Sequence, residues 1–484
     1  MAIKRTVTVA TAVASLAIIG ATTATGFAGG HDRRPSPTLD RAAAGAVDTY
    51  GGARRVDGDQ RATIASALKP AGATNVILII GDGMGASEIT IGRNYLVGAG
   101  GQLRGLDALP ITGQMTHYSV DRKTGKPDYT PDSAATGSAW ATGVKTYDNA
   151  VSVDRHGTAR PTMLQLAKRS GRATGNVTTS EIQDATPAVQ VANISLRKCY
   201  GPNETSASCP EAALENGGKG SISEQLLETR PDLTFGGGSK TFSQKAKAGP
   251  YKDMTLADQA RKRGFTYLTK KEDLAKIGSA DQRHPVLGLF SEGNMPVKFA
   301  SLVASKGGAE KAAVQCQANK DFEKVPTLGD MTGKAIDVLS KSRAGQKKGF
   351  LLQVESASID KKDHAADACG QIGETAQIDD AVAAALDFAK KDGNTLVIVT
   401  ADHAHTSQIV DGATPGLDAR LQTHDGADMI VTYGTAPLGG SQQHTGAQIP
   451  VAAYGPGAAQ VAGLIDQTDL FFTVRDGMNA YRKH

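Results

Sequence analysis

Short apolar runs, each bounded by Gly, Asp or Pro, recur along the chain and have the length of buried β-strands. They are residues 75–80 (NVILII), 350–354 (FLLQV), 396–400 (LVIVT) and 451–454 (VAAY). Runs without polar alternation are typical of a sheet that is covered on both faces. Residues 372–391 lie between two of these runs and carry apolar side chains at helical spacing. The alternation of strands and helices predicts an α/β sandwich.

The N-terminal segment has the three-part layout of a secretory signal peptide. Lys4 and Arg5 precede an apolar run over residues 6–20, and small residues follow over 21–30. The apolar run is shorter than the roughly 20 residues that a membrane-spanning helix needs. We therefore expect residues 1–28 to be removed during export, which leaves a secreted or periplasmic mature chain without a transmembrane segment.

The rest of the chain divides into an arm and one large domain. Residues 29–70 are rich in Gly, Ala, Asp and Arg and show no sustained periodicity, so we expect an N-terminal arm. Apolar runs begin just after it, and we expect one folded domain over residues 71–484. Within this domain, residues 270–324 have weak periodicity and are interpreted as an insertion.

The charge of the chain argues against an extended electrostatic interface. The 53 Lys and Arg residues nearly balance the 49 Asp and Glu residues, and the formal net charge is +4. The basic residues are scattered, and aromatic residues make up only 5% of the sequence. We therefore expect no nucleic acid partner, and recognition of an anion must depend on a few local groups.

Four cysteines in a chain that is expected to be exported indicate two disulfides rather than a thiolate metal site. None of them forms a C-x2-C pair. Cys199 and Cys209 close a short loop, so we expect them to pair with each other, and Cys316 to pair with Cys369. Other pairings stay open at the level of the sequence.

Acidic residues follow three of the predicted strands. Asp82 and Glu355 come directly or nearly directly after two of them, and Asp402 with His403 follows a third. Because ligands of open α/β sheets bind beyond the carboxyl ends of the strands, we expect these side chains to converge. Any one acid alone would more simply be a helix cap or a turn residue. The three together favour a site.

Histidines add to this candidate site. Asp360 and His364 are four residues apart, which places them on one face of a helix and within reach of one metal ion. Alone, such a pair is more typical of a solvated helix face. His444 precedes the last apolar run. Three histidines and several carboxylates without a thiolate suit a catalytic site for two or more Zn²⁺ or hard divalent ions.

Ser133 is the candidate nucleophile. It follows Pro131 and Asp132 and precedes an Ala-rich segment, as at the start of a helix, where backbone N–H groups favour a phosphate. A plain capping segment is the alternative. No G-x-S-x-G sequence surrounds Ser133, so a hydrolase triad is disfavoured and activation by a metal ion is expected instead. Arg197, beside Cys199, is of the residue type that holds two phosphate oxygens at once.

Six motifs resemble those of the bacterial alkaline phosphatase family. They are GDGMG (81–85), TPDSAATGSAW (130–140), QDATP (183–187), SIDKKDHAA (358–366), TADHAH (400–405) and QHTG (443–446). Together with further matches in the family's order, they cover most of the chain. The resemblance implies a central, mostly parallel β-sheet sandwiched between helices and a homodimer in which the N-terminal arm reaches across. It also implies a phosphatase that hydrolyses phosphate monoesters through a phosphoserine.

Carried over position by position, the resemblance implies two Zn²⁺ and one Mg²⁺ per chain. The implied groups are Asp360, His364 and His444 for one zinc; Asp82, Asp402 and His403 for the second; Asp82, Thr186 and Glu355 for magnesium; and Ser133, Arg197, Lys361 and Asp184 for catalysis. Asp184 and Lys361 would act through water on the third metal and the phosphate. They match the enteric bacterial pattern, for which magnesium is the expected third ion.

Two other functions are alternatives. A phosphodiesterase or sulfatase would use the same metal platform, but the third metal set and Arg197 argue against it, and no cysteine lies near Ser133. A secreted protein that binds phosphate or metal without turnover is disfavoured, because the nucleophile, the arginine and the metal ligands are all present.

Overall fold

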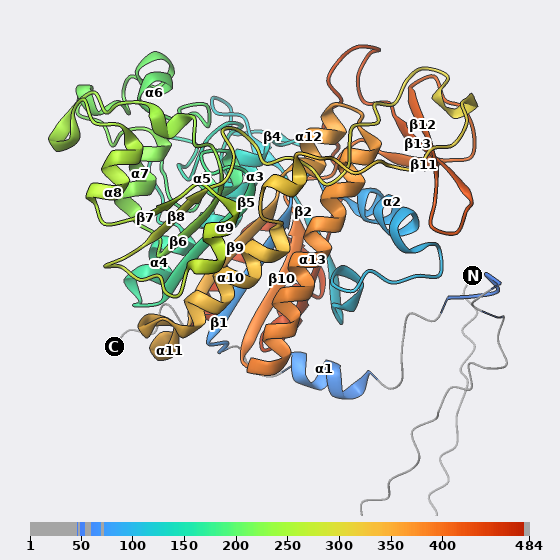
Figure 1. Cartoon of the computed structure of the whole chain (residues 1–484), viewed down its shortest axis with the longest axis horizontal. Helices are drawn as coiled ribbons and strands as arrows, with labels where there is room; N and C mark the ends of the chain where they lie inside the picture. Colours follow the sequence, from blue (N-terminus) through green and yellow to red (C-terminus); the bar gives the residue numbers. More distant parts are fainter. Residues whose placement is uncertain (1–45, 47–48, 54–59, 69–71, 479–484) are drawn as a thin grey trace, which may run out of the picture. The chain divides into compact units, whose positions relative to one another are not determined.

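The computed structural model describes residues 46, 49–53, 60–68 and 72–478, and its centre is a ten-stranded sheet (Figure 1). The strand order is β15-β2-β14-β10-β1-β9-β5-β6-β8-β7. The four strands predicted from apolar runs are all in this sheet, as β1 (Asn75–Gly81), β9 (Phe350–Ser356), β10 (Thr395–Ala401) and β14 (Ile449–Tyr454). The predicted signal peptide and most of the predicted arm lie outside the described residues.

The direction of the strands decides which chain segments meet at one edge of the sheet. β1 pairs in parallel with β9 and β10, and the parallel pairing continues through β5 (Ala173–Glu181), β6 (Leu233–Gly237), β8 (Val286–Leu289) and β7 (Thr266–Leu268). On the other side, β14 is antiparallel to both β10 and β2 (Ile111–Thr116), and β15 (Gly463–Asp466) is parallel to β2. The sheet is thus mostly parallel, as expected, and β14 starts at the edge where β1, β9 and β10 end.

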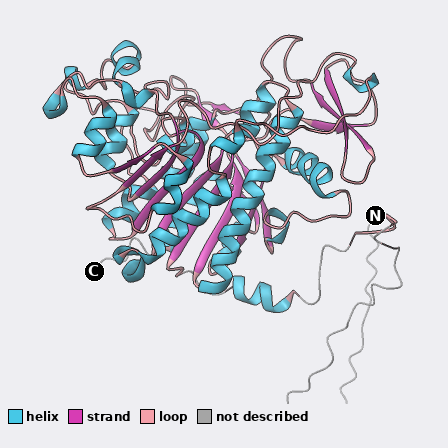
Figure 2. Cartoon of the chain, viewed as in Figure 1, coloured by secondary structure: helices cyan, strands magenta, loops and turns pink. Residues whose placement is uncertain are grey.

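Helices cover both faces of the sheet (Figures 1 and 2). α10 (Leu328–Lys341) and α13 (Ala368–Asp392) lie in front of the strands in Figure 1, and α3 (Ser133–Thr142), α4 (Met163–Arg169) and α14 (Gln467–Gly477) form the opposite layer. Alternate residues of β9 face the two layers: Phe350 packs on Phe388 of α13, whereas Gln353 accepts a hydrogen bond from Trp140 of α3.

Two predicted element boundaries need correction. Helix α13 begins at Ala368 rather than at residue 372, because Asp367 caps its N-terminus by accepting a hydrogen bond from the Gly370 amide. The weakly periodic residues 270–324 were interpreted as an insertion, but they contain β8, which is an internal strand of the central sheet. Four buried residues are too few to produce a clear pattern.

Two further features fall outside the sequence predictions. A seven-residue helix, α1 (Arg61–Ala67), lies in the predicted arm. A three-stranded sheet of β11 (Gln408–Val410), β13 (Asp428–Tyr433) and β12 (Leu417–Gln422) packs around its own small apolar core.

Both expected disulfides are present, Cys199–Cys209 and Cys316–Cys369, and the second contributes to the apolar core of the three-stranded sheet.

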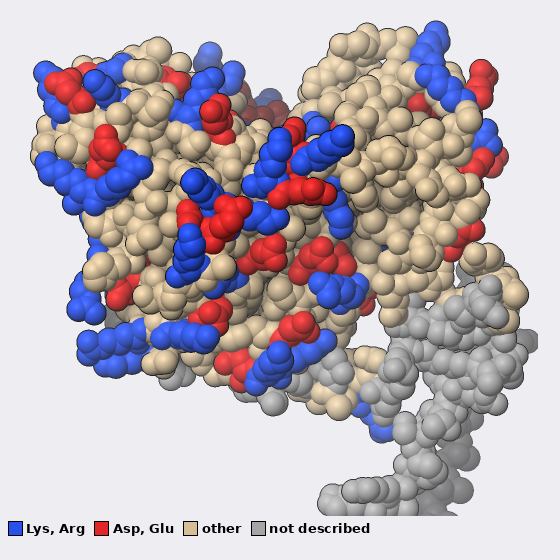
Figure 3. Space-filling model, in the orientation of Figure 1, with Lys and Arg blue, Asp and Glu red and all other residues tan. Residues whose placement is uncertain are grey.

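Charged side chains of both signs are interspersed on the face drawn in Figure 3, which carries no continuous basic stripe. This distribution agrees with the nearly balanced charge of the sequence. None of the helices in the described part of the chain combines the length and the hydropathy that crossing a bilayer demands.

The central strand β1 should be decisive for stability. Ile79 is fully buried between Val354 of β9 and Val399 of β10. We expect Ile79→Ala to lower the free energy of unfolding by about 2–5 kcal/mol, because it removes buried methyl groups and leaves a cavity. Urea denaturation would measure this loss. Leu464→Ala on the edge strand β15, where the side chain is 61% exposed, should change the stability by less than about 0.5 kcal/mol. Equal losses in the two variants would contradict the prediction.

Candidate active site

The side chains that follow the central strands converge beyond the carboxyl edge of the sheet. Asp82 follows β1, and its amide donates to the Ser356 carbonyl at the end of β9. Its own carbonyl accepts from the Asp360 amide in α12 (Ser358–His364), so the chain after β1 is bonded to the chain after β9. Asp402 follows β10, and its Oδ1 accepts from the Gly83 and His403 amides, each at 2.8 Å.

Gly83 permits this close approach. Its φ is +71°, and a Cβ at this position would lie 2.9 Å from the Asp360 Cα and 3.1 Å from the His405 ring. A residue with a side chain would therefore be strained by its conformation and would push the two acidic segments apart.

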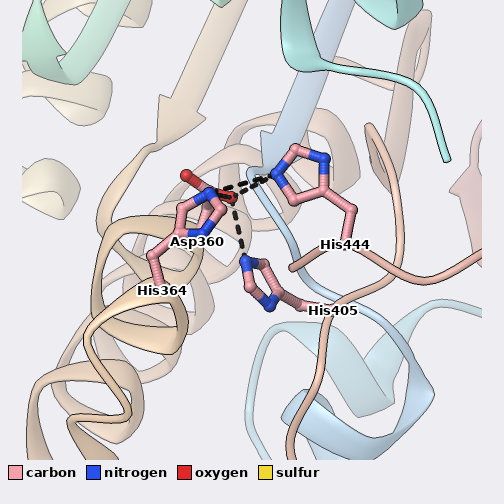
Figure 4. A group of neighbouring side chains, drawn as sticks. All are labelled: Asp360, His364, His405 and His444. Atoms are coloured by element: carbon pink, nitrogen blue, oxygen red, sulfur yellow. Dashed lines mark hydrogen bonds and ion pairs between the residues drawn. The ribbon is translucent and has the colours of Figure 1, made fainter. Parts of the chain in front are cut away.

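Asp360, His364, His405 and His444 form the first cluster, drawn in Figure 4. The Nε2 atoms of His405 and His444 each lie 3.2 Å from Asp360 Oδ1, and His364 Nε2 lies 3.3 Å from the same oxygen. His364 Nε2 and His444 Nε2 are themselves only 3.2 Å apart. Three imidazole rings from three chain segments therefore face one carboxylate oxygen.

The hydrogen bond at Nδ1 of each histidine determines whether its Nε2 presents a lone pair or a proton to the cluster. The Nδ1 atoms of His364, His403 and His444 each face a backbone carbonyl, of Gln442, Ala404 and Pro131 respectively. A carbonyl accepts only, so in the neutral ring Nδ1 carries the proton and Nε2 presents a lone pair. These three rings therefore have the tautomer that binds a metal ion through Nε2.

His405 has the opposite tautomer. The Thr406 amide donates to His405 Nδ1 at 2.9 Å, so the proton of the neutral ring is on Nε2, which faces Asp360. His405 is therefore suited to orient Asp360 and unsuited to be a metal ligand in this position. The sequence reasoning missed it, although it lies only two residues after His403 in the same TADHAH motif.

The second cluster contains the predicted nucleophile. Asp82, Asp360 and His403 bring ligand atoms together, and Asp402 Oδ2 lies 3.2 Å from His403 Nε2. Ser133 is the first residue of α3, as predicted, and Asp132 caps this helix by accepting from the Ala135 amide. Ser133 Oγ lies 3.5 Å from Asp82 Oδ1 and 3.4 Å from His403 Nε2. Only 2% of Ser133 is exposed.

Beside this cluster, Asp184 contacts two of the other predicted residues and caps the helix that contains a third. Asp184 caps the short helix α5 (Ala185–Ala188), which contains Thr186. Its Oδ2 lies 2.8 Å from Lys361 Nζ, and its Oδ1 lies 2.7 Å from Arg197 Nη2. Burial alone would raise the pKa of Asp184, but the charges of Lys361 and Arg197 hold that pKa far below its usual range. Arg197 Nη1 also contacts Asp132 at 3.0 Å, beside Ser133.

The remaining acids are buried without enough positive charge. Burial raises the pKa of Glu355 to about 7, although Lys361 and the hydroxyl groups of Thr178 and Thr186 act to lower it. Burial raises the pKa of Asp402 to about 6. Burial also lowers the pKa of His403 well below its usual value, which keeps the ring neutral. A buried group of carboxylates and imidazole lone pairs fits divalent cations, because cations supply the charge that these side chains lack.

A profile of the alkaline phosphatase family matches residues 73–440. The chain belongs to the alkaline phosphatase family. It is 56% identical to an alkaline phosphatase of Escherichia coli K12, over 91% of this chain and 93% of that protein. It is 54% identical to alkaline phosphatase H of Pseudomonas aeruginosa, over 92% and 94% of the two chains. As a member of this family it is an enzyme, a phosphoric monoester hydrolase.

A solved structure of a TAB5 alkaline phosphatase mutant, with Mg bound in its M3 site, is similar in fold and 27% identical in sequence. The TM-score is 0.61, and the match covers 85% of this chain and 99% of that chain. The likeness agrees with the mostly parallel sheet between helices that was expected from the sequence.

The structure brings every predicted site residue to this edge of the sheet. The set comprises Asp82, Ser133, Asp184, Thr186, Arg197, Glu355, Asp360, Lys361, His364, Asp402, His403 and His444. Which ion each of them binds stays a prediction. Sequence reasoning missed His405 and Tyr200, whose hydroxyl lies 3.1 Å from Asp184 Oδ1.

The tautomer of His405 generates a prediction for metal affinity. His405→Ala removes the imidazole nitrogen that faces Asp360 at 3.2 Å but no predicted ligand, so we expect Zn²⁺ affinity to fall about 10- to 100-fold with the number of bound ions unchanged. Titration of the metal-free protein against a chromophoric chelator measures both quantities. His424→Ala, at an exposed position in the β12–β13 connection, is the control and should bind Zn²⁺ normally. Loss of one ion per chain in His405→Ala would instead make His405 a ligand.

Proposed function

We propose that this phosphatase cleaves phosphate monoesters through a covalent phosphoserine on Ser133. The observation that carries the proposal is the position of Ser133 Oγ, within 3.5 Å of Asp82 Oδ1 and of His403 Nε2 at the start of α3. A hydroxyl among metal-ligating groups and helix N-terminal amides is well placed to attack a bound phosphate. The alternative, a phosphodiesterase or sulfatase, has no comparable observation in its favour.

We propose that each chain binds two Zn²⁺ and one Mg²⁺. One zinc would be held by Asp360, His364 and His444, the second by Asp82, Asp402 and His403, and magnesium by Asp82, Thr186 and Glu355. The lone pairs presented by the three histidines support the zinc assignments. The all-oxygen third set suits magnesium, the ion named for the TAB5 mutant. When bound, such ions lower the pKa of hydroxyl and water oxygens and offset the charge of the phosphate.

The side chains then have distinct tasks in the two displacements. Ser133 loses its proton and forms the Oγ–P bond while the ester P–O bond breaks and the alcohol departs. Water next attacks phosphorus on the opposite side, the Oγ–P bond breaks, and Ser133 regains a proton as phosphate leaves. Arg197 holds two of the non-bridging oxygens throughout. Asp184 holds Arg197 and Lys361 in place, since it contacts both.

We also propose the wider setting that the sequence indicates. Residues 1–28 would direct export, residues 29–70 would form an arm, and residues 71–484 would form the catalytic domain of a secreted or periplasmic homodimer. The two disulfides support an oxidising compartment.

Ser133→Ala should abolish the covalent intermediate. We expect no acid-stable phosphoprotein from radiolabelled phosphate and a fall in kcat of roughly 10³-fold or more, because the nucleophilic oxygen is gone. Ser138→Ala in the same helix is the control. Ser138 bonds to the Ala150 carbonyl and the Ser152 amide, so the variant should still be labelled. Undiminished labelling of Ser133→Ala would refute the assignment.

Removal of metal should abolish turnover reversibly. We expect chelation to stop hydrolysis of p-nitrophenyl phosphate at alkaline pH, and Zn²⁺ with Mg²⁺ to restore it, because the clustered carboxylates and imidazoles need cations for their catalytic geometry. Metal content, measured alongside activity, provides the control. Full activity in a verified metal-free sample would contradict the proposal. A fully loaded but inactive sample would direct attention to diester and sulfate substrates.

A further inference from the structure

The arginine assigned to the phosphate is already engaged in the free protein. Arg197 Nη1 lies 3.0 Å from Asp132 Oδ2, and Nη2 lies 2.7 Å from Asp184 Oδ1. A guanidinium holds phosphate most strongly through two parallel N–H···O bonds. The two carboxylates occupy only two of the five guanidinium N–H groups, so phosphate can bind to others, but any turn of Arg197 toward phosphate loosens these carboxylate contacts.

Loosening of Arg197 leaves Asp184 with less positive charge around it. Asp184 is only 7% exposed, and a buried carboxylate that loses a charged partner is strongly destabilised. Lys361 stays on Oδ2 at 2.8 Å, and the Ala185 amide donates to Oδ1 at 2.8 Å. Any other group that donates a hydrogen bond to Asp184 Oδ1 therefore affects how easily Arg197 is released.

Tyr200 supplies such a donor. Its hydroxyl donates to Asp184 Oδ1 at 3.1 Å, the same oxygen that Arg197 contacts. We propose that Tyr200 is a positioning residue of the phosphate site: its hydroxyl stabilises Asp184 while Arg197 turns toward phosphate, and so strengthens phosphate binding. This inference rests on the proposed function, in which Arg197 binds the phosphate.

The backbone holds Tyr200 in place independently of Arg197. Tyr200 follows Cys199, which is in a disulfide with Cys209. The amide and the hydroxyl of Ser223, at the start of α7 (Ile222–Thr229), donate to the Tyr200 carbonyl at 3.0 and 2.8 Å. The phenol therefore keeps its position when the arginine moves.

The hydroxyl also remains a donor under alkaline conditions. Burial, followed by the nearby charge of Asp184, raises the pKa of Tyr200 well above that of an ordinary tyrosine. An unshifted phenol would be half deprotonated near pH 10. The contact with Asp184 thus persists over the pH range in which an alkaline phosphatase works.

Tyr147 offers a matched control for the loss of a phenol hydroxyl. Its hydroxyl donates to the Ser195 carbonyl at 3.2 Å, in the same segment of chain as Arg197. Tyr147→Phe and Tyr200→Phe each remove one hydroxyl bonded to this region, but only the second removes a donor from Asp184.

The test is a double-mutant cycle on the metal-loaded enzyme, with inorganic phosphate as the probe. The inhibition constant of phosphate is measured for the unmodified protein, Tyr200→Phe, Arg197→Ala, the double variant and Tyr147→Phe. We expect Tyr200→Phe to raise this constant about three- to tenfold, the effect of part of one charge-assisted hydrogen bond. Tyr200→Phe should add no further change once Arg197 is absent, and Tyr147→Phe should leave the constant within about twofold.

The outcomes separate this inference from the proposed function. If Arg197→Ala weakens phosphate binding but Tyr200→Phe does not, the role of Tyr200 is wrong and the proposed function stands. An equal effect of Tyr200→Phe with and without Arg197 would also overturn the inference, since the tyrosine would then act on the general structure. If Arg197→Ala itself leaves phosphate binding unchanged, the proposed role of the arginine is wrong as well.

Discussion

The main constraint on this structure is that carboxylate and imidazole groups, which accept hydrogen bonds, are packed close together at the largely buried carboxyl edge of the sheet. Asp360 Oδ1 faces three imidazole nitrogens, and two of these rings present lone pairs to each other at 3.2 Å. Such an arrangement is unfavourable without cations, because buried carboxylates lack the solvation that water would supply. The surrounding fold must therefore hold the acceptors in place by backbone bonds. The carbonyl groups that fix the Nδ1 protons of His364 and His444 do this.

The topology of the sheet explains how residues far apart in the sequence reach this position. Asp82, Glu355 and Asp402 follow or end parallel strands, and so they lie at the carboxyl edge. His444 precedes its strand instead. It reaches the same edge because β14 runs antiparallel to β10, which brings the start of β14 beside the end of β10. One reversed strand therefore brings in His444, the predicted metal ligand that comes latest in the chain.

The sequence predicted what local patterns encode and missed what the tertiary structure decides. The four apolar runs are strands, and Ser133 is at the start of a helix, as the residues before and after it suggested. Chemistry at the strand ends could be predicted because acids follow three of the buried strands, although any one of them alone would be an ordinary cap or turn residue. In contrast, β8 is too short to have a distinctive pattern, and the direction of β14 depends on its partners.

The role of His405 was equally hidden, although the motif that contains it was noticed. The amino-acid sequence does not show which ring nitrogen of a histidine carries the proton, since that depends on a hydrogen bond to a neighbouring amide or carbonyl. Only the Thr406 amide on Nδ1 distinguishes His405 from His403, His364 and His444. The position of Tyr200 was also not predictable, because it too depends on a tertiary contact. Its contact with Asp184 joins two loops whose proximity the sequence does not encode.

The short helix α12 (Ser358–His364) links the histidine cluster to Asp184, and so the proposed metal site to the proposed phosphate site. Its consecutive residues Asp360 and Lys361 contact the histidine cluster and Asp184, respectively. Seven residues are too few for a helix to be stable alone, so contacts at both ends determine its position. The Asp360 amide is bonded to Asp82, and the His364 carbonyl accepts from the Gln442 amide. A shift of α12 would therefore move Asp360 and Lys361 together, and so would change the proposed metal-binding geometry and the anchoring of Arg197 through Asp184 at the same time.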